Sequence, residues 1–161
     1  MTRGRRLAFW AVVAGQAVAL LALIGVNELA LAGGEQVALR TVPVDPVDLF
    51  RGRYVTLRYE ITTVQVPDGT QPGDTVYVPL SHVGEAWQAG FALPKAPTDG
   101  TYIRGTVRSA AQGTAQVEYG IKTYFTDEDD ARSLELAGQL LVTVVLEDGG
   151  QAHISRVEPV R

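Results

Sequence analysis

The sequence predicts a mainly β protein in which one amino-terminal transmembrane helix precedes a small antiparallel β-barrel or sandwich domain with one short α-helix. Two observations give this fold class. An apolar block lies near the amino terminus, and behind it apolar and polar residues alternate with period two between glycine-rich turns. At 161 residues the chain has room for one domain and one further element.

The first element expected is a membrane helix. Three arginines in residues 1–6 precede the apolar run LAFWAVVAGQAVALLALIGV, and NELALA continues the helical pattern to residue 32. The run is long enough for a bilayer core of roughly 30 Å. The positive-inside rule puts the amino terminus in the cytoplasm. We therefore expect a signal-anchor over residues 7–32 and an extracytoplasmic (periplasmic) domain over residues 33–161 of a single-pass inner (plasma) membrane protein.

A cleaved signal peptide is the competing interpretation of the same block. Ala30 and Ala32 have the small-x-small spacing that signal peptidase accepts. A signal-peptide core has about 7 to 15 apolar residues, and this run is longer, which favours a retained anchor. Cleavage after Ala32 stays an open alternative.

The β domain is expected to contain seven or eight short strands. EQVALRTV, residues 35–42, gives the first strand, which Pro43 ends because proline cannot donate into a sheet. The turns PDGTQPGD, PTDG, SAAQG and EDGG separate the later ones. These later strands are expected at residues 54–61, 74–80, 86–93, 101–109, 114–121, 140–147 and 152–160. The pattern does not choose between barrel and sandwich.

The segment VPVDPVDLFRGRYVTLRYEI, residues 42–61, is expected to form a corner before a strand. Asp45 and Pro46 suit a type I turn, and Asp48 can cap a backbone amide in the same way. Arg51-Gly52-Arg53 gives a second turn. The strand then alternates, and its core face is expected to consist of Val55, Leu57, Tyr59 and Ile61. Arg51, Arg53 and Arg58 lie near the acidic pair and can form ion pairs or face lipid headgroups or a partner.

The one short helix is expected in FTDEDDARSLELAGQ. Thr126 is a suitable N-cap with Asp129 three residues later, and Gly138 can end the helix. Acidic residues in the first turn suit the helix dipole. The DEDD run lacks the glycine turn and distal glutamate of a helix-loop-helix calcium site.

Composition excludes several kinds of function. The absence of cysteine excludes disulfides, thiolate catalysis and thiolate metal sites. A formal net charge of −4, concentrated after the basic amino terminus, argues against nucleic acid as a partner. His82 and His153 lack metal-binding spacing, and the serines lie outside any nucleophile motif. The motifs therefore predict no catalytic residue, metal or cofactor, and an enzyme is not favoured.

Two blocks carry a family resemblance. GRYVTLRY, Gly52 to Tyr59, resembles the defining motif of the GDYXXLXY protein family, with Arg53 in place of the aspartate. VEYGIKTYFTDEDDARSLE, Val117 to Glu135, is similar to a later block of that family, with Thr-Asp-Glu replacing its usual turn after Tyr-Phe. The resemblance implies a single-pass membrane protein with an exported β-rich domain and no established activity. Family genes often neighbour one for a multi-pass membrane protein, which implies a complex.

Two functional hypotheses follow. The first is a membrane-anchored extracytoplasmic accessory or interaction protein, in contact with the lipid bilayer and working with an integral membrane partner. The alternative is an envelope enzyme or a small-ligand or divalent-ion binder that uses Asp45 and Asp48 with an arginine for an anionic group. The family-motif and interaction candidates are Asp45, Pro46, Asp48, Arg51, Gly52, Arg53, Tyr54, Leu57, Tyr59, Tyr119, Gly120, Tyr124 and Phe125.

Overall fold

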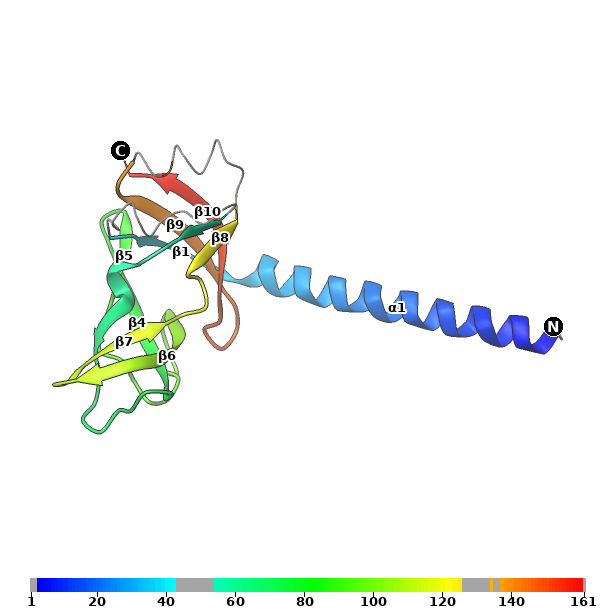
Figure 1. The fold of residues 1–161 in the computed structure, drawn as a ribbon, viewed down its shortest axis with the longest axis horizontal. Helices are drawn as coiled ribbons and strands as arrows, with labels where there is room; N and C mark the ends of the chain where they lie inside the picture. Colours follow the sequence, from blue (N-terminus) through cyan, green and yellow to red (C-terminus); the bar gives the residue numbers. More distant parts are fainter. Residues whose placement is uncertain (1–2, 43–53, 126–133, 135–136, 161) are drawn as a thin grey trace. The chain divides into compact units, whose positions relative to one another are not determined.

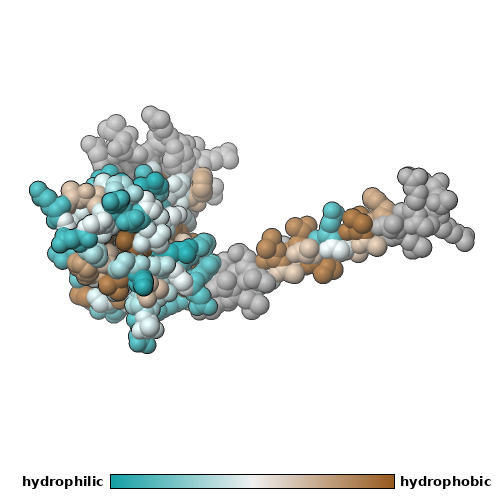
Figure 2. Space-filling view, turned by 90° about the horizontal axis from the view of Figure 1, so that it is seen from below, coloured by the Kyte–Doolittle hydropathy of each residue, from teal (hydrophilic) through white to brown (hydrophobic). Residues whose placement is uncertain are grey.

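The computed structural model describes residues 3–42, 54–125, 134 and 137–160, and it divides the chain into two units at Gly34. The first unit holds the helix α1 (Arg3–Gly33). Its apolar side chains are exposed, with exposed fractions of 61% to 68% at Phe9, Trp10, Leu20, Leu21 and Leu23. Figure 2 shows this hydrophobic surface along the described part of the helix. The predicted amino-terminal helix is confirmed.

The membrane assignment of that helix is not confirmed. Across the residues that the structure describes, no helix combines the length and the apolar character that a bilayer crossing requires. The predicted transmembrane signal-anchor over residues 7–32 is corrected accordingly, because the described stretch falls short on this criterion.

The second unit is built around a nearly closed five-stranded antiparallel barrel. The strand order is β3-β7-β6-β4-β5. The two edges meet after β5, where the amide of Ala92 donates to the carbonyl of Gln65 at 2.9 Å. A mainly β fold with barrel character is thus confirmed. The bounds are β3 (Thr63–Gln65), β4 (Thr75–Val83), β5 (Ala86–Ala89), β6 (Tyr102–Ala111) and β7 (Thr114–Glu118).

Two smaller antiparallel sheets complete the β domain. One has the order β1-β9-β10, with bounds β1 (Glu35–Arg40), β9 (Leu140–Leu146) and β10 (Ala152–Pro159). The other pairs β2 (Tyr54–Thr56) with β8 (Thr123–Phe125). Figure 1 shows β8, β9 and β10 at one end of the domain and β6 and β7 at the other.

The alternation of apolar residues placed most strands correctly because each strand has one buried face. The strands expected over residues 86–93 and 114–121 end earlier, at Ala89 and Glu118, and the largest departure is the strand expected over residues 54–61. It stops after β2, and a 3-10 turn (Glu60–Thr62) follows, closed by a bond from the amide of Thr62 to the carbonyl of Tyr59 at 3.1 Å. Its predicted core face is nevertheless buried at every position, with exposed fractions of 2% to 4% for Val55, Leu57, Tyr59 and Ile61.

The core joins the barrel to the β1-β9-β10 sheet. Its most deeply buried side chains come from both, and they include Val37, Leu39, Val78, Ile103, Val107, Val142 and Val144. The helix expected after Thr126 falls mostly on residues 126–133 and 135–136, outside the described residues. Leu134 is described and buried.

Candidate functional site

The structure brings the two motif blocks side by side. In the β2–β8 pair, Tyr54 lies opposite Phe125, Val55 opposite Tyr124 and Thr56 opposite Thr123. The pairing continues beyond β2, because the amide of Leu57 donates to the carbonyl of Lys122 at 2.7 Å. We call this pair of strands the β2–β8 ribbon. Residues 54–57 of the first motif block and residues 122–125 of the later block, far apart in sequence, therefore pair with each other.

A reciprocal pair of tyrosines fixes the base of the ribbon. The hydroxyl of Tyr59 donates to the carbonyl of Ile121 at 2.8 Å, and the hydroxyl of Tyr119 donates to the carbonyl of Ile61 at 2.7 Å. Each tyrosine thus bonds to the isoleucine that follows the other tyrosine by two positions. Burial raises the pKa of both phenols well above the usual range, so both stay neutral donors.

A groove of about 650 Å³ opens beside this tyrosine pair. One wall is the segment 56–63, and the other is formed by β7, the segment after it and Arg108 of β6. Polar and apolar groups both line it, and the charged residues in its described lining are Arg58, Glu60, Arg108, Glu118 and Lys122.

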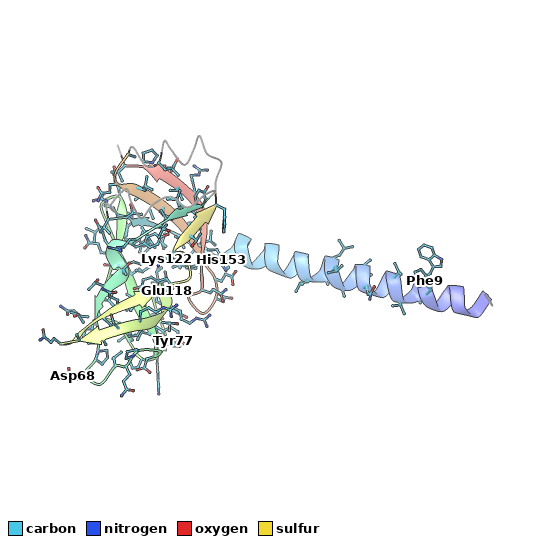
Figure 3. All side chains as sticks on the ribbon, viewed as in Figure 1. Phe9, Asp68, Tyr77, Glu118, Lys122 and His153 are labelled. Carbon is cyan, nitrogen blue, oxygen red and sulfur yellow. The ribbon has the colours of Figure 1, made fainter. Side chains whose placement is uncertain are left out.

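The charges in the groove divide into paired and unpaired groups. Arg108 and Glu118 form an ion pair. Among the described residues, the side chains of Arg58, Glu60 and Lys122 have no ion-pair partner. Figure 3 labels Glu118 and Lys122, which come from β7 and from the segment that leads to β8. The groove therefore offers exposed charge above a buried floor.

The two histidines lie in different settings. His82 packs edge to face against Trp87 with ring centroids 5.3 Å apart, across the β4–β5 pair. Nε2 of His153 lies 2.9 Å from Oε1 of Glu147, beside a second hollow that Arg104 also lines. Within the described ranges, no group of three or more histidine, aspartate or glutamate side chains is placed to hold a metal.

The predicted site residues divide into three groups. One group lies outside the described residues: Asp45, Pro46, Asp48, Arg51, Gly52 and Arg53. A second group, Leu57, Tyr59 and Tyr119, is buried in the core. The third belongs to the ribbon and its approach: Tyr54 contributes backbone to β2, Gly120 is exposed with φ at +79°, Tyr124 is half-buried against the core, and Phe125 is 74% exposed.

Sequence reasoning missed the reciprocal tyrosine pair and the groove. A signal for the pair existed, because Tyr-x-Ile occurs twice, as YEI at residues 59–61 and YGI at residues 119–121. The groove had no comparable signal. Lys122 enters it only because the ribbon pairing places it beside Leu57.

The same two blocks fall inside a match to a family model. The model of the GDYXXLXY protein family matches residues 16–157. The chain belongs to the GDYXXLXY protein family. Comparisons with curated proteins and with solved structures each found no match. In this GDYXXLXY protein the motif leucine and last motif tyrosine, Leu57 and Tyr59, are core residues that form part of the groove lining.

Proposed function

We propose that this GDYXXLXY protein is a non-enzymatic accessory subunit whose β2–β8 ribbon binds an integral membrane partner. The pairing of β2 with β8 carries the proposal, since it joins both motif blocks into one ribbon outside the two larger sheets. Phe125 at the end of β8 is 74% exposed. Aromatic side chains presented on well-supported elements are typical anchors of protein interfaces.

The base of the ribbon supports this role. Tyr59 and Tyr119 tie the segments that lead into β2 and β8 to each other through two hydrogen bonds between side chain and backbone. A ribbon held in this way loses little conformational freedom when a partner binds, and that lowers the entropic cost of association.

The location is also a proposal: the plasma membrane, with the β domain on its extracytoplasmic side. Its support is the exposed apolar surface of α1, for example at Trp10, Leu20 and Leu21, together with the three arginines in residues 1–6. Such a surface is suited to contact with lipid or with an apolar partner. Membrane fractionation, and protease digestion of intact and opened cells from which any outer membrane has been removed, test this location. Recovery of the protein in the soluble fraction, or protection of the β domain until the plasma membrane is opened, would contradict it.

The partner is tested by cross-linking in the native host, purification of the full-length protein and mass spectrometry of what is captured. The wild type should capture a multi-pass membrane protein in stoichiometric amount, and the Phe125→Ser variant should not capture it. Phe91→Ser is the matched control, because Phe91 is 49% exposed and lies just after β5, away from the ribbon sequence. Both variants should unfold cooperatively on heating. Capture that survives Phe125→Ser, or is lost equally in Phe91→Ser, would refute the role of the ribbon.

The alternative is a small-ligand or divalent-ion binder, or an envelope enzyme, with Asp45 and Asp48 at its centre. The groove favours a ligand-binding role, because it has the volume of a small-molecule site. A divalent ion or envelope metabolite that raises the melting temperature of the wild type but not of Asp45→Asn would support this alternative. Equal shifts in both proteins would count against Asp45.

A further inference from the structure

We propose that the groove binds a small organic phosphate, with Arg58 and Lys122 as its anion-binding residues. The two residues line the groove from two different segments, Arg58 from the segment after β2 and Lys122 from the segment before β8, and both are exposed. This site is separate from the partner role proposed for Phe125, which is not part of the groove lining.

The described lining of the groove has a net charge opposite to that of the domain around it. The chain carries −4 in total and residues 1–34 carry +2, from three arginines and Glu28, so residues 35–161 carry −6. Among the described residues that line it, the groove holds three cations and two carboxylates, a balance of +1. A concave positive site on an acidic domain raises the local concentration of anions relative to the rest of the surface.

Two of the cations are available to a ligand. Arg108 is already paired with Glu118. The side chains of Arg58 and Lys122 have no ion-pair or hydrogen-bond partner among the described residues, and only their backbone carbonyls serve the fold. These carbonyls accept from the amides of Val42 and Leu57 at 2.9 and 2.7 Å.

Hydroxyl groups in the groove suit a phosphate. Thr56, Thr62 and Thr63 line it. Oγ1 of Thr62 accepts a hydrogen bond from the amide of Tyr59 at 3.2 Å, which leaves its own hydrogen free to donate. A phosphate monoester carries a charge of about −1.5 to −2 and three acceptor oxygens, a match for two cations and neighbouring hydroxyl donors.

The size of the groove points to an organic phosphate. Small-molecule sites have volumes of about 300–1,000 Å³, and the groove has about 650 Å³, far more than the anionic group alone needs. The remaining space is lined in part by Leu57, Val117 and Ile121. These three residues are only 2% to 4% exposed, so they form a buried floor beneath the ligand.

The test is calorimetric titration of the full-length protein with glycerol 3-phosphate at fixed ionic strength, with sodium chloride as the blank. We expect saturable binding to the wild type. The affinity should fall about tenfold or more in Arg58→Ala and in Lys122→Ala, because each variant loses a charge-assisted hydrogen bond. Lys95→Ala is the matched control, an exposed lysine outside the groove, and should bind as the wild type does.

Three outcomes overturn the proposal. They are heat of binding no greater than that of the chloride blank, unchanged affinity in the Arg58→Ala, Lys122→Ala double variant, and equal weakening in Lys95→Ala. Titration with vesicles that contain phosphatidylglycerol distinguishes a lipid headgroup from a free organic phosphate as the ligand. Vesicle binding that is lost in the Arg58→Ala, Lys122→Ala double variant, without binding to glycerol 3-phosphate, would mean that the groove recognises a lipid headgroup and would also refute a small-molecule site. Phe125→Ser should bind glycerol 3-phosphate normally, so a failure of the partner proposal is distinguishable.

Discussion

Replacement of Tyr59 or Tyr119 by phenylalanine removes one hydroxyl from the reciprocal pair and leaves the ring in place. The carbonyl of Ile121 or of Ile61 then loses a buried donor. An unsatisfied buried acceptor costs about 1–3 kcal/mol, and the retained ring opens almost no cavity, so each variant should lose about that much free energy of unfolding. The double variant should lose about twice as much if the two bonds act independently, since they reach different carbonyls.

Urea unfolding of the full-length protein, monitored by the circular dichroism signal of its β structure, measures these losses. Tyr77→Phe is the matched control. Tyr77 is half-buried and packs edge to face on Tyr102, with ring centroids 5.8 Å apart, and its hydroxyl has no hydrogen bond within the described residues. It should change the free energy of unfolding by less than about 0.5 kcal/mol. Single variants of the pair that match Tyr77→Phe would refute the reasoning.

Three further predictions concern the same domain. Because burial raises the pKa of Tyr59 and Tyr119, the unfolded chain releases their protons above about pH 10 while the folded chain keeps them, so stability should fall by about 1.4 kcal/mol per pH unit for each tyrosine. Urea titrations from pH 9 to about 11 should show this slope, and it should vanish in the double phenylalanine variant. Gly105→Ala should cost about 1–3 kcal/mol or more in thermal unfolding, because a Cβ there would overlap a methyl group of β7 and lie 2.8 Å from the ring of Tyr119. Gly90→Ala, whose Cβ would be 3.4 Å from its nearest neighbour, should be nearly neutral. Thr41→Val should cost about 1–3 kcal/mol in the same assay, because the buried hydroxyl accepts a hydrogen bond from a β9 amide at 2.8 Å. A variant as stable as the wild type would show that water replaces this hydroxyl.

Much of the β domain was predictable because its strands have one buried face. Residues 35–42, 74–80, 101–109 and 140–147 alternate clearly, and each corresponds to an observed strand. Two of the three-residue strands, β3 and β8, were missed, since three residues hold too little alternation to be recognised. The break after β2 was missed for another reason. The 3-10 turn keeps Ile61 buried, so the apolar pattern continues through it.

The candidate site was less predictable because it depends on which segments pair. The sequence marked both motif blocks, but alternation gives no information about strand partners. Only the pairing of β2 with β8 places Lys122 in the same groove as Arg58. The tyrosines at 59 and 119 could be predicted as buried or functional, whereas their mutual bonds depend on a register that no local pattern specifies.

The spacing of fixed and unspecified positions in the motif matches the buried and the exposed residues of this segment. In G-D-Y-x-x-L-x-Y the fixed leucine and last tyrosine are Leu57 and Tyr59, which are buried and hold the base of the groove. Two of the unspecified positions, Thr56 and Arg58, line the same groove with a hydroxyl and a charge. β2 ends at Thr56, but buried and more exposed side chains continue to alternate as far as Tyr59. The fixed leucine and tyrosine of the motif therefore serve the core of this chain, and the unspecified positions between them lie on the more exposed side.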